Sequence, residues 1–250
     1  MNILYAFPLF AALGLVMGYL INYLSDVLPR TRDFSQPVCL NCNARRNFNE
    51  YAGMRKCSNC GKGISLRFKL VLIFSALIIG LLWIFPPHHL NYWLAVICFV
   101  YLMTIAVIDL EYRVILNQMA IAGIFLGFIT GFTINGLIPT LIGGGAGFAI
   151  MLALYFLGEL FARYMAKKRG VENDEVALGF GDVNLGGILG FMLGWPVILA
   201  CLLLAILFGG LVSAAMVTWM LIKHDYKPFT AIPYAPFLII SGSILLYLIK

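Results

Sequence analysis

Eight long apolar segments divide this sequence and leave one extended polar stretch, residues 25–67, between the first two. They cover residues 3–24, 68–86, 90–108, 117–134, 138–162, 183–194, 196–222 and 232–249. Most have close to the roughly 20 residues that an α-helix needs to cross the hydrocarbon core of a bilayer. The chain is 62% hydrophobic and only 11% charged, far outside the range of soluble domains. We therefore expect an all-α, polytopic membrane protein with about eight transmembrane helices.

Two of these segments are unusual. Segment 3–24 has no basic region before it and no small-residue cleavage site after it, so we expect a retained helix rather than a signal peptide. Segment 183–194 is too short for an ordinary span. It is either less tilted than the others, buried inside the protein, or continuous with segment 196–222 through Trp195-Pro196.

The basic residues are distributed unevenly between the two sides of the membrane. Of the 17 Lys and Arg residues, all but Lys250 lie in loops that alternate crossings place on one side. The positive-inside rule makes that side cytoplasmic and places both termini on the outer side. The net charge of +6 is then an orientation signal, with Lys167-Lys168-Arg169 as its second cluster, and we expect no nucleic-acid partner.

Two acidic residues lie at the ends of apolar segments. Asp109 ends the third segment, and Asp182 opens the sixth within Gly179-Phe180-Gly181-Asp182. Two crossings separate them, so both belong to the cytoplasmic boundary, where an ionisable side chain suggests function. If the carboxylates are close, they share a proton, and the pair can activate a water and polarise a carbonyl. The alternatives are a helix-end charge for Asp109 and an N-cap for Asp182.

Four cysteines lie in the polar stretch 25–67. They form two C-x-x-C pairs, separated by 14 residues, which are Cys39, Cys42, Cys57 and Cys60. This spacing is typical of a four-cysteine zinc ribbon, and the loop is expected in the reducing cytoplasm. We predict a structural Zn(II), because a loop of this size has too little core to fold unaided. A redox-active C-x-x-C is the alternative.

These motifs together resemble a known family. Gly179-Phe180-Gly181-Asp182 resembles the GxGD signature of intramembrane aspartyl proteases. With the segment 109–117, it resembles the type IV prepilin peptidases in particular, although Ile115 stands where that family commonly has proline. The family's other motifs are matched at Gly18, Asn22, Val27-Leu28-Pro29-Arg30 and Pro233-Tyr234-Ala235-Pro236-Phe237. The resemblance therefore extends over the whole chain.

The resemblance implies an enzyme of the bacterial inner membrane. Such an enzyme removes the leader from type IV prepilins or type II secretion pseudopilins, after a glycine, with Asp109 and Asp182 as catalytic residues. Bifunctional members also methylate the new N-terminus with S-adenosylmethionine, and many carry a four-cysteine cytoplasmic domain. Residues 66–72 lack the glutamate that the family often has at the entry to the second span.

The expected organisation has three parts: a first transmembrane helix at 1–24, a cytoplasmic zinc loop at 25–67 and a seven-helix membrane peptidase domain at 68–250. Three other functions remain open: a presenilin-like protease that cuts within membrane spans, a cation transporter, and a non-enzymatic scaffold. The sequence leaves open the oligomeric state, the physiological substrate and the distance between the two acids.

Overall fold

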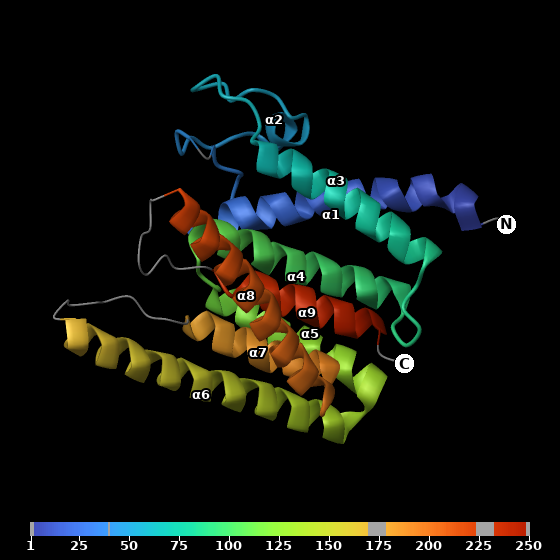
Figure 1. Cartoon of the computed structure of the whole chain (residues 1–250). Helices are drawn as coiled ribbons and strands as arrows, with labels where there is room; N and C mark the ends of the chain where they lie inside the picture. The colour runs from blue at the N-terminus through green and yellow to red at the C-terminus, as the bar shows by residue number, and fades with distance from the viewer. Residues whose placement is uncertain (1–2, 40, 170–178, 224–232, 249–250) are drawn as a thin grey trace. The chain divides into compact units, whose positions relative to one another are not determined.

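A computed structural model of the protein describes residues 3–39, 41–169, 179–223 and 233–248 (Figure 1). Its helices are α1 (Ile3–Thr31), α2 (Phe48–Ala52), α3 (Leu66–Ile84), α4 (Tyr92–Tyr112), α5 (Asn117–Asn135), α6 (Leu137–Arg169), α7 (Phe180–Leu193), α8 (Val197–Ile222) and α9 (Ala235–Leu248). Each of the eight apolar segments corresponds to a helix, and α2 is a short addition within the cysteine loop. The predicted all-α fold is confirmed.

Six of the helices are long and apolar enough to cross a membrane, namely α1, α3, α4, α5, α6 and α8. Helices α7 and α9 are apolar but shorter, with 14 residues each. At 1.5 Å per residue, a helix of that length spans only about 21 Å. Among the described residues, the expected eight apolar helices are thus six that could cross a membrane and two that are shorter, so the count of eight is approximate.

Helix α7 is a separate helix buried inside the protein. It ends at Gly194, whose φ of +70° takes the left-handed conformation that glycine adopts most easily. The next residue, Trp195, donates its backbone N–H to the carbonyl of Pro139 at 2.9 Å, so the chain leaves the helix axis there. Helices α5, α6, α8 and α9 all pack against α7. Fusion with the next segment is therefore the wrong alternative, and burial within the protein is the right one.

Helix α1 continues to Thr31, past the end of the apolar segment at residue 24. Hydropathy does not find this extension because it contains Ser25 and Asp26, which are polar. Both side chains are nevertheless buried, together with Val27 and Leu28. Burial is possible because the polar groups have partners: the Ser25 hydroxyl donates to the carbonyl of Asn22, and Asp26 forms an ion pair.

The chain divides into two compact units, residues 1–108 and 109–250. In the first unit, α1 packs closely against α3. A Cβ atom at Gly18 would lie 3.1 Å from the Cα of Leu72, so the glycine permits this approach. Beside it, Tyr51 of the cysteine loop packs on Phe68 and Leu72 of α3. The loop is thus attached to the helices of its own unit.

In the second unit, glycines hold α6 against α7. A Cβ atom at Gly143 would lie 2.5 Å from the carbonyl oxygen of Gly190, and one at Gly147 would collide with the carbonyl of Gly186. Only glycine lets the two backbones come this close. The glycines of this part of the chain are packing residues, and they fix the position of α7, the helix that carries Asp182.

Candidate functional site

The two acids of the predicted site both belong to the second unit. Asp109 lies in the last turn of α4 and is 6% exposed, and Asp182 lies in the first turn of α7 and is 8% exposed. The two carboxylates are close enough for the charge of Asp109 to act on Asp182. The structure thus brings into electrostatic reach two residues that the sequence places only at the same depth.

Asp109 is held from two sides. The backbone N–H of Ala235, the first residue of α9, donates a hydrogen bond to its carboxylate, and Arg113 contributes an attractive charge. Among the residues that the structure describes, the buried oxygen Oδ2 of Asp109 has no hydrogen-bond partner. A buried acceptor without a partner costs about 1–3 kcal/mol, so this oxygen is suited to receive a proton or a water.

Asp182 is in the first turn of α7, but it is not the N-cap. The N-cap is Gly179, whose carbonyl accepts the backbone N–H of Asp182 at 3.0 Å. The N-cap alternative is therefore wrong. A carboxylate at this position still benefits from the positive end of the helix dipole, which favours a negative charge there.

Gly181 makes room for the turn that follows α4. A Cβ atom at Gly181 would lie 2.8 Å from the Cβ of Ile115, too close for any larger residue without a shift. Ile115 stands in the turn between α4 and α5, where the resembled family commonly has proline. The second glycine of the GxGD motif thus lets Asp182 approach the segment that begins with Asp109.

Two further groups border the acids, and the sequence alone did not assign them a role. The N–H of Ala235 bonds to Asp109, and Tyr234 is close enough to Asp182 for the charge of Asp182 to act on it. Both belong to Pro233-Tyr234-Ala235-Pro236-Phe237, the C-terminal segment that carries part of the family resemblance. That resemblance was the signal that could have found them.

The four cysteine sulfurs of the first unit form one cluster. All four Sγ atoms lie within 4.8 Å of one another, and the distances of 3.6 Å between Cys39 and Cys60 and 3.8 Å between Cys42 and Cys57 join one C-x-x-C pair to the other. Tetrahedral zinc with Zn–S bonds of about 2.3 Å places its sulfurs about 3.8 Å apart. The arrangement fits a single four-cysteine metal site better than two independent redox pairs.

The two C-x-x-C turns have the same backbone geometry. In each, the carbonyl of the first cysteine accepts a backbone N–H four residues later at 2.9 Å, from Asn43 to Cys39 and from Gly61 to Cys57. Although burial opposes it, hydrogen bonds from the backbone N–H groups of Asn41 and Cys42 lower the pKa of the Cys39 thiol to about 6. Backbone hydrogen bonds likewise lower the pKa of Cys57, so the first cysteine of each turn favours the thiolate form that binds metal. At Cys42 a backbone hydrogen bond from Ala44 is outweighed by burial and the neighbouring thiols, which raise its pKa to about 11.

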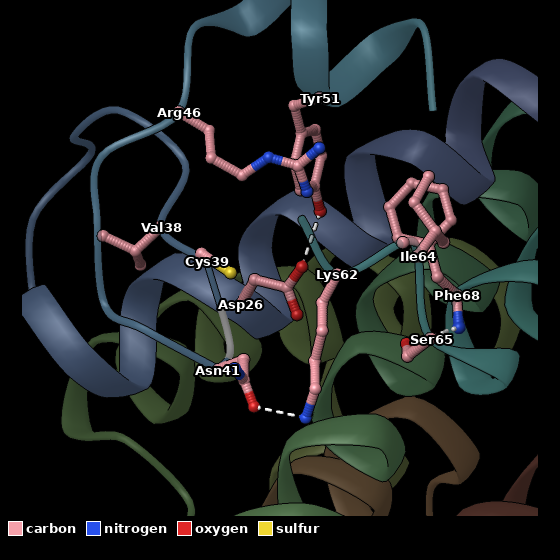
Figure 2. A pocket seen from close by; sticks show the side chains of 11 residues that line it. Asp26, Val38, Cys39, Asn41, Arg46, Tyr51, Lys62, Ile64, Ser65 and Phe68 are labelled. Carbon is pink, nitrogen blue, oxygen red and sulfur yellow. Dashed lines mark hydrogen bonds between the residues drawn. The ribbon is translucent and has the colours of Figure 1, made fainter. Parts of the chain in front are cut away.

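A buried polar network attaches this loop to α1 and α3 (Figure 2). Figure 2 shows the hydroxyl of Tyr51 donating to Oδ2 of Asp26 at 2.7 Å. Arg67, from α3, forms an ion pair with the other oxygen of Asp26. Asp26 is 3% exposed, and burial beside its carboxylate raises the pKa of Tyr51. Asp26 is a buried acid that the sequence analysis did not single out, because it lies beyond the apolar segment.

Comparison with known proteins confirms the family resemblance. Residues 96–214, which include both acids, match the type IV leader peptidase family. Proteins named prepilin leader peptidase/N-methyltransferase from Aeromonas hydrophila and Pseudomonas aeruginosa are each 28% identical, over 76% of this chain and 61% of their own. One of that name from Bacillus subtilis is 28% identical, over 77% of this chain and 70% of its own.

The chain thus spans about 61% of the length of the first two of these relatives. No solved structure matches it.

Proposed function

We propose that this protein is a prepilin peptidase, an aspartyl endopeptidase that removes the leader from type IV prepilins or type II secretion pseudopilins. The observation that carries the proposal is the pair of buried carboxylates, Asp109 on α4 and Asp182 on α7, within electrostatic reach of each other. Both lie in the segment that matches the type IV leader peptidase family. The names of the relatives supply the substrate class.

The chemistry follows from two neighbouring carboxylates. Both cannot ionise cheaply, so the pair holds one proton. The ionised carboxylate removes a proton from a water, whose oxygen attacks the carbonyl carbon of the scissile bond, while the protonated carboxyl donates to the carbonyl oxygen. The C–N bond then breaks, and the leaving amine takes a proton from the pair. We leave open which aspartate is the base and which the acid.

The orientation of the chain supports a cytoplasmic active site. The excess of Lys and Arg in alternate loops favours both termini on the periplasmic side of the bacterial inner membrane. Both acids then lie at the cytoplasmic boundary. The substrate's apolar stem would lie in the bilayer beside the enzyme, and its leader would project into the cytoplasm, which brings the scissile bond to the acids.

The cysteine cluster is proposed to hold a structural zinc ion. Four thiolates complete a tetrahedral site and leave no open position for a reacting ligand, so the metal would stabilise the loop rather than take part in hydrolysis.

A second activity, methylation of the new N-terminal amine, is proposed on the names of the relatives, which include N-methyltransferase. S-adenosylmethionine would supply the methyl group, whose carbon is electrophilic because it is bonded to a positively charged sulfonium sulfur.

The direct test is processing of a prepilin in membranes that contain this protein. We expect a product that has lost the leader, and that carries one additional methyl group when S-adenosylmethionine is present. A prepilin in which a bulky residue replaces the glycine before the scissile bond should stay intact. A wild-type prepilin that keeps its leader would refute the peptidase assignment, and a cleaved but unmethylated product would refute only the second activity.

A further inference from the structure

Arg113 is the first residue after α4, and its backbone conformation is unusual for an arginine. Its φ of +54° lies in the left-handed region, which glycine adopts more easily than a residue with a side chain. Its N–H donates to the carbonyl of Asp109 at 2.9 Å, so the turn that ends α4 closes on the residue that carries the first acid. Because a glycine would relieve the cost of this conformation, the arginine side chain is expected to contribute something that glycine lacks.

The surroundings of Asp109 indicate what the side chain contributes. Asp109 is buried, whereas Arg113 is exposed at the end of the helix. Burial and the second carboxylate, that of Asp182, both oppose a negative charge on the pair. The charge of Arg113 and the backbone N–H of Ala235 both favour a negative charge on Asp109. Arg113 thus brings a full positive charge to a pair of acids that would otherwise resist ionisation.

The proposed reaction needs the pair with one carboxylate ionised. If both aspartates are protonated, neither can remove a proton from the attacking water. Buried carboxyls that share a site keep their protons to higher pH than exposed carboxyls do. A nearby positive charge lets such a pair lose its first proton at lower pH, so the singly ionised form appears earlier as the pH rises.

We propose that Arg113 is a positioning residue of the peptidase, whose charge keeps one of the two aspartates ionised at neutral pH. This inference rests on the proposed function, since it concerns the protonation of the proposed catalytic pair. Arg113 acts through Asp109 and does not itself transfer a proton, because a guanidinium stays protonated in proteins.

Other titratable groups lie on the helices around the pair, and all of them stay in place when Arg113 is changed. They are Glu111 at the end of α4, Glu159 and Arg163 on α6, Asp182 on α7, Cys201 on α8, and Tyr234 before α9. Asp182 is the second member of the pair, and its charge acts on Tyr234. Glu159 and Arg163 pair with each other, and Glu111 is exposed. A change in pH dependence that follows from loss of the charge at Arg113 is therefore attributable to that charge.

The competing explanation is that Arg113 only orients the chain in the membrane. It is the only Lys or Arg between Tyr112 and Asn117, the end of α4 and the start of α5, and the positive-inside rule gives it that role without any effect on the acids. An orienting charge does not alter the pH dependence of an enzyme that is already inserted and folded. The two explanations therefore differ in the pH profile of cleavage.

The test is the rate of prepilin cleavage as a function of pH, with the whole chain in lipid nanodiscs. Arg113→Gln removes the charge, so the pair should lose its first proton only at higher pH. The acid limb of the profile should then move to higher pH, and the rate at a pH on that limb should fall by about 2–5-fold. Arg113→Lys keeps the charge and should retain the wild-type profile.

Two glycine variants separate the charge from the fold. Arg113→Gly removes the charge and relieves the left-handed backbone. It should therefore melt at no lower a temperature than the wild type, and yet show the same displaced acid limb as Arg113→Gln. The matched control is Arg32→Gly, because Arg32 follows α1 in the same conformation, with a φ of +57° and its N–H on the carbonyl of Leu28 at 3.0 Å. This control should leave the acid limb where it is in the wild type.

The proposal is overturned if the acid limb of Arg113→Gln coincides with that of the wild type, if Arg113→Lys is displaced as far as Arg113→Gln, or if Arg32→Gly moves the limb equally. A wild-type protein that does not cleave prepilin would instead refute the peptidase assignment, so the two failures are distinguishable.

Discussion

Two buried carboxylates in this chain have opposite surroundings. Asp26 has a hydrogen-bond donor on each oxygen, whereas Oδ2 of Asp109 has none among the described residues. A buried acid with all its partners stabilises the fold, and one with an unpaired oxygen is costly unless it serves a reaction. Both aspartates are almost completely buried, but their hydrogen-bond partners distinguish Asp26, which is structural, from Asp109, which is a candidate catalytic residue.

Loss of one donor to Asp26 should weaken the attachment of the cysteine loop. Tyr51→Phe leaves a buried carboxylate oxygen unpaired, and we expect a loss of about 1–3 kcal/mol in local stability. The measurement is amide hydrogen exchange of α2, which should become faster. The control is Tyr19→Phe, which removes a hydrogen bond to the carbonyl of Ala52 in a more exposed place. If the two substitutions increased the exchange rate of α2 equally, the hydrogen bond from Tyr51 to Asp26 would not be what attaches the loop.

Gly181 should be required because of Ile115. In Gly181→Ala the new Cβ would meet the Cβ of Ile115, so Asp182 must shift, and we expect leader cleavage to fall by about 10-fold or more. Ile115→Gly in the same chain should restore part of the rate because it removes the Cβ atom that the new methyl group would meet, together with the Cγ1 and Cδ1 atoms beside it. A double variant no faster than Gly181→Ala would mean that this contact does not position Asp182.

At the scale of elements, the glycines of α6 differ sharply from one another. Gly147→Ala would push a Cβ into the backbone of α7, and we expect a loss of about 1–3 kcal/mol. Gly145→Ala, on the same helix, faces open space and should be neutral or stabilise by up to about 1 kcal/mol. Thermal unfolding in detergent measures both. A similar melting temperature for the two variants would contradict the close packing of α6 on α7.

The cysteine loop is an element that should depend on its metal. Zinc binding to such a site supplies folding free energy on the order of 10 kcal/mol, so a strong chelator should open the loop. Alkylation followed by mass spectrometry should then modify Cys39, Cys42, Cys57 and Cys60, which are protected before chelation. Cys98 and Cys201 are buried in helices and should stay unmodified throughout. Rapid alkylation of the four cysteines before chelation would refute the metal site.

The elements show why hydropathy predicted some features and missed others. It found the eight apolar helices because each is a continuous apolar run. It missed the end of α1, since Ser25 and Asp26 are polar in sequence but have partners in the fold. It also left α7 ambiguous, because a short apolar run reads alike whether it crosses a membrane or is buried in protein.

At the scale of the whole molecule, the order of crossings predicts which ends of helices share a side, but it does not predict distance. Because two crossings separate them, Asp109 and Asp182 were predicted at the same boundary of the membrane. The distance between the two acids depends on contacts of particular residues, such as Gly181 with Ile115 and Ala235 with Asp109. The hydrophobic pattern of the sequence does not predict such contacts. The family resemblance identified the segments involved, and the structure identifies the atoms that meet within them.

The most direct test of the account is the mass of a prepilin incubated with membranes that contain Asp109→Asn or Asp182→Asn. Each substitution removes one member of the proton-sharing pair, and we expect cleavage to fall by about 10²–10⁴-fold. Glu111→Gln, the same chemical change at an exposed residue two positions from Asp109, should cleave at the wild-type rate. Wild-type cleavage by either aspartate variant would contradict the claim that these two residues form the catalytic pair.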